Sequence, residues 1–258
     1  MSTEETTQKV LAIDTRELTK IYKTKNKTIH AVDGLSLSVE AGEFFSLLGV
    51  NGAGKTTAIK LLSCLSRPDG GEAYLEGHSI RTEADRVREV INVSPQSTAV
   101  ALNLSVRENL ALSAGLWGVP KGKIAASVAD VLSRLGLEEV ADDRAGTLSG
   151  GWQRRLSIAM ALVTDPHILF LDEPTLGLDV LARRELWGVI RSLRGRVTVV
   201  LTTHYLEEAE ALSDRIGIMA HGRLCALGSP AELCARAGVD RFEDAFVALA
   251  TEGKEAAI

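Results

Sequence analysis

Long hydrophobic runs are missing from this sequence of 258 residues. No apolar stretch approaches the roughly 20 residues that a membrane-spanning helix needs. The first seven residues, Met1–Thr7, are polar and acidic, unlike a secretory signal peptide, and residues 1–7 are expected to be flexible. Any role at a membrane is therefore predicted to pass through a partner protein.

Cysteine is scarce, and positive charge is not in excess. The three cysteines, Cys64, Cys225 and Cys234, are scattered without C-x-x-C spacing. This pattern argues against disulfides and a zinc site and fits a reducing cytosol. Lysine and arginine number 29 against 34 for aspartate and glutamate, a formal net charge of −5. Nucleic-acid binders usually carry a basic face, so no nucleic-acid partner is expected.

The chain does contain an alternation of strand and helix patterns. Its composition, 45% hydrophobic and 24% charged, is that of an ordinary globular protein with a sizeable core. Apolar runs at residues 43–48, 167–171 and 197–202 are typical of buried strands, whereas residues 97–165 are mostly helical in pattern. Strands that alternate with helices predict an α/β fold with a mainly parallel sheet.

Local signals place several element boundaries. Residues 11–14 and 18–22 suggest a first strand region. Ser105 and Glu108 form a capping-box pattern that opens a helix to about Trp117, and residues 123–135 form a second amphipathic helix. Apolar residues spaced along one helical face predict a docking helix at about 239–250, and residues 251–258 are expected to form a flexible tail.

The stretch Gly49–Thr57 fits G-x-x-x-x-G-K-[ST], a phosphate-binding loop. Its glycines let backbone N–H groups point inward as an anion nest, and the following helix adds the positive end of its dipole. Lys55 is placed to reach the β- and γ-phosphates of a triphosphate, and the Thr56 hydroxyl is placed to ligate Mg²⁺. A glycine-rich turn matching by accident is the alternative, but the preceding strand and the helix from Thr57 supply the context that the motif requires. The predicted nucleotide contacts here are Asn51, Gly52, Gly54, Lys55, Thr56 and Thr57.

Two carboxylates follow the apolar run 167–171. A carboxylate at the end of a central strand lies beside the phosphate loop in such folds. Asp172 is therefore predicted to hold Mg²⁺ through its water shell, and Glu173 to accept a proton from an attacking water. The alternative is an acidic turn or helix start after a buried strand.

A second glycine-dependent anion site lies at residues 148–154. Ser149 can cap a helix, and Gly150 and Gly151 expose its first N–H groups. A plain helix cap is the default interpretation of such a stretch alone. However, a chain that binds one triphosphate has little need for two anion nests on it, so the second nest is predicted to serve a nucleotide held by another copy.

Together with Gln96, residues 176–179 and His204, these motifs occur in the order and spacing of ABC transporter ATPase subunits, which the chain resembles over about residues 12–250. The resemblance implies a head-to-tail dimer that sandwiches two ATP molecules with Mg²⁺. It implies that Gln96 links Mg²⁺ and the attacking water to the membrane partner, that Asp179 reaches across the dimer, and that His204 contacts the γ-phosphate. Tyr22 resembles the aromatic residue that stacks on adenine, with a core tyrosine at a strand end as the alternative.

The resemblance also implies a domain organisation. We expect one P-loop NTPase domain at 8–250, with a mainly parallel central sheet, an antiparallel β region and an inserted helical subdomain. The RecA-like core would comprise about 8–96 and 166–236, and the helical subdomain about 97–165. Two positions depart from the family pattern: Trp152 replaces a common Gln, and Leu176 replaces a common Ser.

The sequence thus predicts an ATP-hydrolysing subunit that pairs with a second ATPase subunit, as a homodimer, and powers a separate integral membrane permease at the cytoplasmic face of the membrane. Residues 203–210 and 242–246 resemble the drug, lipid, polysaccharide or peptide export group. The alternative is a soluble ABC ATPase of an assembly system such as iron–sulfur cluster biogenesis. A scaffold without turnover would need a missing base, and Glu173 argues against it. The sequence leaves the cargo open.

Overall fold

The structure, a computed structural model, describes residues 10–24 and 27–255. The predicted N-terminal tail, residues 1–7, and the last three residues of the predicted C-terminal tail lie outside the described residues. Within the described ranges, no helix has the length and apolar character to cross a membrane.

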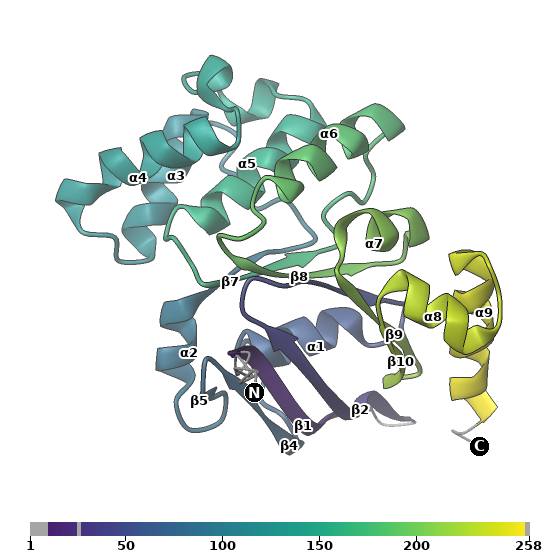
Figure 1. The fold of residues 1–258 in the computed structure, drawn as a ribbon. Helices are drawn as coiled ribbons and strands as arrows, with labels where there is room; N and C mark the ends of the chain where they lie inside the picture. Colours follow the sequence, from purple (N-terminus) through teal and green to yellow (C-terminus); the bar gives the residue numbers. More distant parts are fainter. Residues whose placement is uncertain (1–9, 25–26, 256–258) are drawn as a thin grey trace, which may run out of the picture.

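A six-stranded sheet forms the centre of the molecule, in the order β10-β9-β3-β8-β7-β6 (Figure 1). Every neighbouring pair from β9 to β6 is parallel, and only β10 runs antiparallel to its neighbour, so the predicted mainly parallel sheet is confirmed. Strands β3 and β7 are buried along their whole length, which explains their continuous apolar sequences. The strands are β3 (Phe44–Leu48), β6 (Ile91–Ser94), β7 (Ile168–Asp172), β8 (Thr198–Thr203), β9 (Arg215–Ala220) and β10 (Arg223–Gly228).

An antiparallel sheet of order β2-β1-β4-β5 packs beside the central one. Its strands are β1 (Leu11–Lys23), β2 (Thr28–Glu40), β4 (Gly70–Leu75) and β5 (His78–Ser79). The two segments predicted near the N-terminus belong to one long strand, β1. Its register shifts between Thr15 and Leu18, where Glu17 has φ +50°, so a bulge interrupts the alternating pattern without ending the strand.

One apolar core joins the two sheets through α1 (Lys55–Leu62), the helix that follows the phosphate loop. This core contains Ile13 of β1, Leu35 of β2, Leu61 of α1 and Phe170 of β7, all fully buried. In Figure 1, α1 lies between the central sheet and the antiparallel sheet. The phosphate loop is therefore fixed at both ends by packed elements.

A second core lies on the opposite side of the central sheet, under the helices α3 (Val106–Leu116), α4 (Lys121–Arg134), α5 (Gly150–Leu162) and α6 (Val180–Arg191) (Figure 1). The capping box of Ser105 and Glu108 is present, as predicted, and Trp117 is the C-cap of α3. Helix α4 begins at Lys121, two residues earlier than predicted, because Pro120 serves as its N-cap. Two short 3₁₀ helices, Glu138–Val140 and Ala145–Thr147, connect α4 to α5.

The remaining helices are α2 (Ala84–Val90), α7 (Leu206–Leu212), α8 (Pro230–Ala237) and α9 (Phe242–Glu255). The C-terminal helix was predicted at 239–250 with a flexible tail after it. The prediction for residues 251–255 is wrong, because α9 continues to Glu255 and Thr251 donates its hydroxyl to the carbonyl of Val247 at 2.7 Å. Apolar residues of α9 pack with β9 and α8, and this docking stabilises the helix.

Candidate nucleotide site

The phosphate loop connects β3 to α1, and its backbone accepts only glycine at two positions. Gly54 has φ +106°, and a Cβ there would lie 2.1 Å from the carbonyl oxygen of Ala31. A Cβ on Gly49 would lie 2.4 Å from the carbonyl oxygen of Met219. The helix begins at Lys55 rather than Thr57, so the N–H groups of its first turn face the loop.

Lys55 is buried, and its ammonium group lies at the centre of the loop. Its Nζ donates to the carbonyl oxygens of Gly49 at 2.7 Å and Val50 at 3.4 Å, and lies 3.2 Å from Oε1 of Glu173. A buried ammonium group held by carbonyl oxygens offers a fixed positive point for phosphate oxygens. The loop therefore combines backbone donors with a placed cation.

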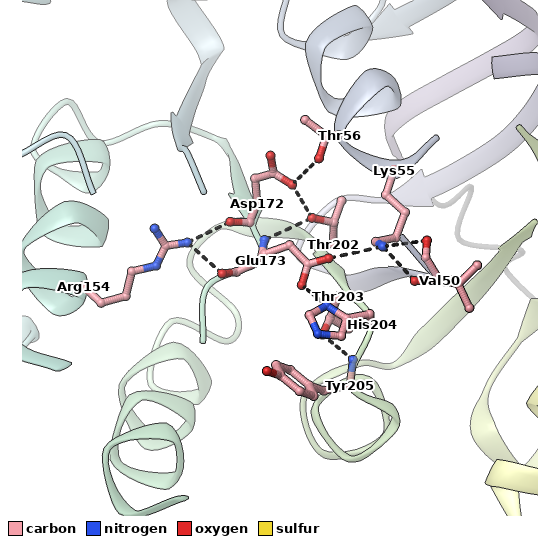
Figure 2. Close-up of polar contacts among 11 residues, drawn as sticks. Val50, Lys55, Thr56, Arg154, Asp172, Glu173, Thr202, Thr203, His204 and Tyr205 are labelled. Carbon is pink, nitrogen blue, oxygen red and sulfur yellow. Dashed lines mark hydrogen bonds and ion pairs between the residues drawn. The ribbon is translucent and has the colours of Figure 1, made fainter. Parts of the chain in front are cut away.

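Oxygen atoms of two predicted Mg²⁺ residues meet beside the loop. Thr56 Oγ1 donates to Asp172 Oδ1 at 3.1 Å, and Thr202 Oγ1 donates to the same oxygen at 2.6 Å (Figure 2). Among the described residues, no group of three or more His, Cys, Asp or Glu side chains is placed to hold a metal ion. Mg²⁺ needs no such group, because it binds one or two carboxylates together with substrate phosphates and water. The hydroxyl and carboxylate oxygens present therefore fit this ion.

Glu173 lies between Lys55 and His204, as Figure 2 shows. Its Oε2 is 2.7 Å from His204 Nδ1, and its Oε1 faces the Lys55 ammonium group. The backbone of Glu173 has φ +48°, and its N–H donates to both the carbonyl and the hydroxyl oxygen of Thr202 at 3.1 Å. A left-handed glutamate costs free energy, and strain of this kind clusters at functional sites. Three residues predicted from separate motifs thus meet in one place.

Ser149 caps α5, as predicted, by accepting from the backbone N–H of Trp152 at 3.5 Å. Ser149 and Gly150 are exposed, so the N-terminus of α5 is open to a ligand. Gly151 packs against α6, where a Cβ would lie 3.2 Å from Cβ of Ala182. Within the described chain, no hydrogen bond joins Ser149 to the phosphate loop of its own subunit. This separation agrees with a nest that serves another copy.

Other predicted site residues occupy different positions. Asp179 is the N-cap of α6, and its Oδ1 accepts from the N–H groups of Leu181 and Ala182 at 2.9 and 3.0 Å. Gln96 is exposed in the loop after β6. Tyr22 on β1 is 41% exposed, which removes the alternative of a core tyrosine. Each of these side chains is accessible to a ligand or a partner.

Neither departure from the family pattern replaces a residue predicted to contact phosphate. Trp152 packs partly buried against the helical core, and the Arg155 guanidinium lies 4.4 Å above its ring. Leu176 is 43% exposed, and Val180 and Leu181 beside it are 62% and 74% exposed. Leucine in place of serine therefore extends an exposed apolar segment next to Asp179.

Two buried charged residues were missed by the sequence analysis. Arg154 on α5 donates to backbone carbonyls of the loop that carries Glu173 (Figure 2). Glu208 on α7 is fully buried, with Oε1 accepting from Trp187 Nε1 at 3.1 Å. Burial raises the pKa of Glu208, and the nearby hydroxyls of Thr203 and Thr175 oppose that rise. The sequence pattern could have revealed both residues, because each charged residue falls on the apolar, buried face of its helix. The buried positions are 154, 158 and 161 in α5, and 208, 209 and 212 in α7.

Comparison with known proteins agrees with this geometry. The sequence model of the family described as ABC transporter matches residues 32–176, more than half of the 258 residues. The chain is 44% identical over 228 residues to the daunorubicin/doxorubicin resistance ATP-binding protein DrrA of Streptomyces peucetius, covering 88% of this chain and 68% of that protein. It is 46% identical over 225 residues to ATP-binding cassette sub-family A member 7 of Mus musculus, covering 86% of this chain but only 10% of that protein.

Solved structures show the same fold. A dimeric ATP-binding cassette in a post-hydrolysis state, bound to ADP and Pi, matches with a TM-score of 0.75 and 27% identity, covering 84% of this chain and 98% of that one. The cassette cbiO1 of Clostridium perfringens, part of the transporter complex cbiONQ, matches with a TM-score of 0.78 and 28% identity, covering 87% and 91%. Because of its phosphate loop, its Glu173 site and these similarities, the chain belongs to the ABC transporter family, as a cassette that binds and hydrolyses ATP.

Proposed function

We propose that the chain powers an exporter, as one of two identical cassettes that close head-to-tail around ATP and act on a separate membrane-spanning permease from the cytoplasmic face. The likeness to the drug-resistance ATP-binding protein DrrA and to the phospholipid-transporting ATPase ABCA7 of Homo sapiens supports export of an amphiphilic cargo. The similarity to these relatives favours a transporter subunit over a soluble assembly ATPase.

The observation that carries the proposed mechanism is the position of Glu173 between Lys55 and His204. Lys55 and the N-terminus of α1 bind and orient the phosphates of ATP. Glu173 accepts the proton of the attacking water, and His204 holds the carboxylate in place at 2.7 Å.

Thr56 and Asp172 would hold Mg²⁺, with Gln96 in the same ligand set. When bound, this ion neutralises charge on the β- and γ-phosphate oxygens. The protein orients the Asp172 carboxylate for this purpose. The hydroxyls of Thr202 and Thr56 both donate to Asp172 Oδ1, at 2.6 and 3.1 Å, and direct this carboxylate toward the phosphate loop.

The second half of the site comes from the partner copy. The exposed Ser149 and Gly150 of one subunit would face the phosphates bound by the other, with Asp179 reaching across beside them. Tyr22 would stack on the adenine ring. The exposed apolar residues Leu176, Val180 and Leu181 support burial against a second subunit in this region.

Replacing Glu173 by Gln tests the mechanism. Glu173→Gln keeps the shape and the hydrogen-bonding capacity but cannot take a proton. We expect unchanged ATP affinity, accumulation of an ATP-bound dimer, and a kcat lower by about 10²–10⁴-fold. Glu139→Gln makes the same change at an exposed position and should behave as the wild type. Near-normal turnover by Glu173→Gln would rule out the role given to Glu173.

Transport is tested separately. The chain is co-expressed with a candidate membrane-spanning permease, purified with it, and placed in lipid vesicles. Stimulation of ATP hydrolysis by amphiphilic drugs or phospholipids, with movement of the cargo away from the cassette side, is expected for an exporter. Movement toward the cassette side would contradict the direction, and failure of the chain to associate with any membrane protein would support the assembly ATPase.

A further inference from the structure

Arg154 is a buried arginine that contacts the nucleotide site only through the backbone. It is 4% exposed, and its guanidinium donates to five carbonyl oxygens. Three belong to the end of β7 and the loop after it: Asp172 at 2.8 Å, Glu173 at 3.1 Å and Pro174 at 2.7 Å. Two belong to the loop after β6: Pro95 at 2.5 Å and Gln96 at 3.2 Å. One side chain therefore joins two loops that follow neighbouring parallel strands.

The third segment joined by this residue is its own helix. Arg154 lies in the second turn of α5, whose N-terminus carries the exposed Ser149 and Gly150. We propose that Arg154 is a positioning residue that fixes the loops of Glu173 and Gln96 relative to the N-terminus of α5. This inference rests on the proposed roles of Glu173 and Gln96 and adds a residue that holds both.

The chemistry of the contact requires an arginine. A guanidinium offers five N–H donors in a planar fork, whereas an ammonium group is a single point charge. No carboxylate forms a salt bridge with Arg154 in the described part of the chain, so carbonyl oxygens solvate the buried charge. Burial lowers the pKa of Arg154 to about 10, which leaves the side chain charged at neutral pH.

The backbone of Glu173 shows why this restraint matters for hydrolysis. The residue has φ +48°, and its peptide groups are held from two sides. Thr202 accepts from its N–H at 3.1 Å, and Arg154 donates to its carbonyl at 3.1 Å. Without the guanidinium, the strained loop can relax and carry the carboxylate away from Lys55 and His204. The phosphate loop makes none of these contacts and should still bind ATP.

The same links connect the two nucleotide sites of a dimer. In the proposed dimer, the N-terminus of α5 faces the ATP of the partner, while Glu173 faces the ATP of its own subunit. A shift of α5 toward the partner's nucleotide therefore moves the loop that carries Glu173. Coupling of this kind requires that both ligands favour one arrangement of a shared element.

Arg154→Lys is the test, because it keeps the positive charge but cannot reach all five carbonyl oxygens. We expect kcat to fall by about tenfold or more, with the ATP affinity of the protein within about twofold of wild type. The Hill coefficient for ATP hydrolysis should also fall toward one. Arg154→Gln, which removes the charge and keeps an N–H₂ donor, should show the same separation of kcat from affinity if Arg154→Lys folds poorly.

Arg155→Lys is the matched control. It changes the next residue of α5, whose guanidinium packs on Trp152 and lies 3.8 Å from Glu185, away from both loops. Wild-type kcat and Hill coefficient are expected. The proposal is overturned if Arg154→Lys and Arg154→Gln hydrolyse ATP within about twofold of wild type. It is also overturned if kcat per folded molecule is unchanged and only the melting temperature falls, because Arg154 then has only a structural role. Near-normal ATP hydrolysis by Glu173→Gln would instead refute the proposed role of Glu173 as proton acceptor. That result is distinct from the outcome for the Arg154 variants.

Discussion

Gly54 is the residue at which one added carbon atom should do the most harm to nucleotide binding. A Cβ there meets the Ala31 carbonyl oxygen at 2.1 Å, in a strand that cannot move without disturbing the core. Gly77 also has positive φ, +82°, but a Cβ there meets nothing within 4 Å. We expect Gly54→Ala to abolish measurable ATP binding by calorimetry.

Gly77→Ala is the matched control, because it carries only the left-handed penalty of about 1–2 kcal/mol. It should bind ATP normally, with a lower midpoint of urea unfolding. Equal ATP affinity of the two variants would show that the clash with Ala31 is relieved by movement and that the loop is less constrained than its geometry indicates.

Lys55→Ala should weaken ATP binding more than any change on the exposed face of the same helix. The ammonium group is buried and fixed by two carbonyl oxygens, so its removal deletes charge-assisted hydrogen bonds to phosphate and leaves Glu173 without its cation. Such bonds contribute about 1.5–3 kcal/mol each, so Kd should rise by about 10- to 100-fold or more. Fluorescence titration with a labelled ATP measures it. Lys60→Ala, on the exposed face of α1, is the control, and equal Kd values for both variants would contradict the phosphate contact.

Helix α7 carries a titratable group that the proposed reaction does not use. The pKa of Glu208 is raised above its ordinary value of 4.5 by burial. As the pH rises, the unfolded chain releases this proton first, and between the two pKa values the folded state holds more protons. The stability contribution of this group is therefore fully present below the unfolded pKa and is lost as pH rises through the folded pKa.

Glu208→Gln removes that ionisation. In urea unfolding from about pH 4.5 to about pH 8, the variant should lose less unfolding free energy than the wild type as the pH rises. Glu207→Gln, one residue away and exposed, should retain the wild-type slope. A Glu208→Gln slope equal to that of the wild type would mean that Glu208 titrates normally in the folded protein.

Among the helices and strands, sequence patterns predicted those elements whose position depends on residues close together in the chain. The buried strands β3, β7 and β8 were found because a strand covered on both faces is apolar throughout. The first strand region was predicted as two segments, 11–14 and 18–22, because the bulge at Glu17 breaks the alternation of β1 between them. The last helix was predicted to end at residue 250, whereas α9 continues to Glu255, five residues beyond its last member of the apolar cluster, Ala250.

The site residues also divide into those that local sequence predicts and those that depend on distant elements. Lys55, Asp172 and Glu173 follow from local motifs that carry their own geometry, and the structure brings Lys55 and Glu173 to 3.2 Å. Arg154 and Glu208 were missed because their partners lie in other elements, and a charged residue in a helix is usually solvated. Asp179 was predicted from the family resemblance, which gave a contact across a dimer and not the local cap that the structure shows.

For the whole molecule, a site shared between two copies predicts a particular dependence on protein concentration. Where monomers predominate, the rate should rise with the square of the concentration, and it should become linear once dimers form. ATP binding to the phosphate loop should occur at all concentrations. A rate that stays strictly linear down to concentrations well below dimer formation would contradict the shared site, and steady-state assays over a dilution series decide the question.

The N-cap of α6 favours the separated state of the two subunits in the proposed dimer. The Asp179 carboxylate is already engaged with the N–H groups of Leu181 and Ala182 at 2.9 and 3.0 Å. If it turns to a neighbouring subunit, α6 loses its N-cap, at a cost of about 1 kcal/mol in each copy. Contacts made on ATP binding would have to offset this cost, and α6 would regain its cap when the subunits separate. In the proposed dimer, the local cap of α6 would therefore favour separation of the two subunits after hydrolysis.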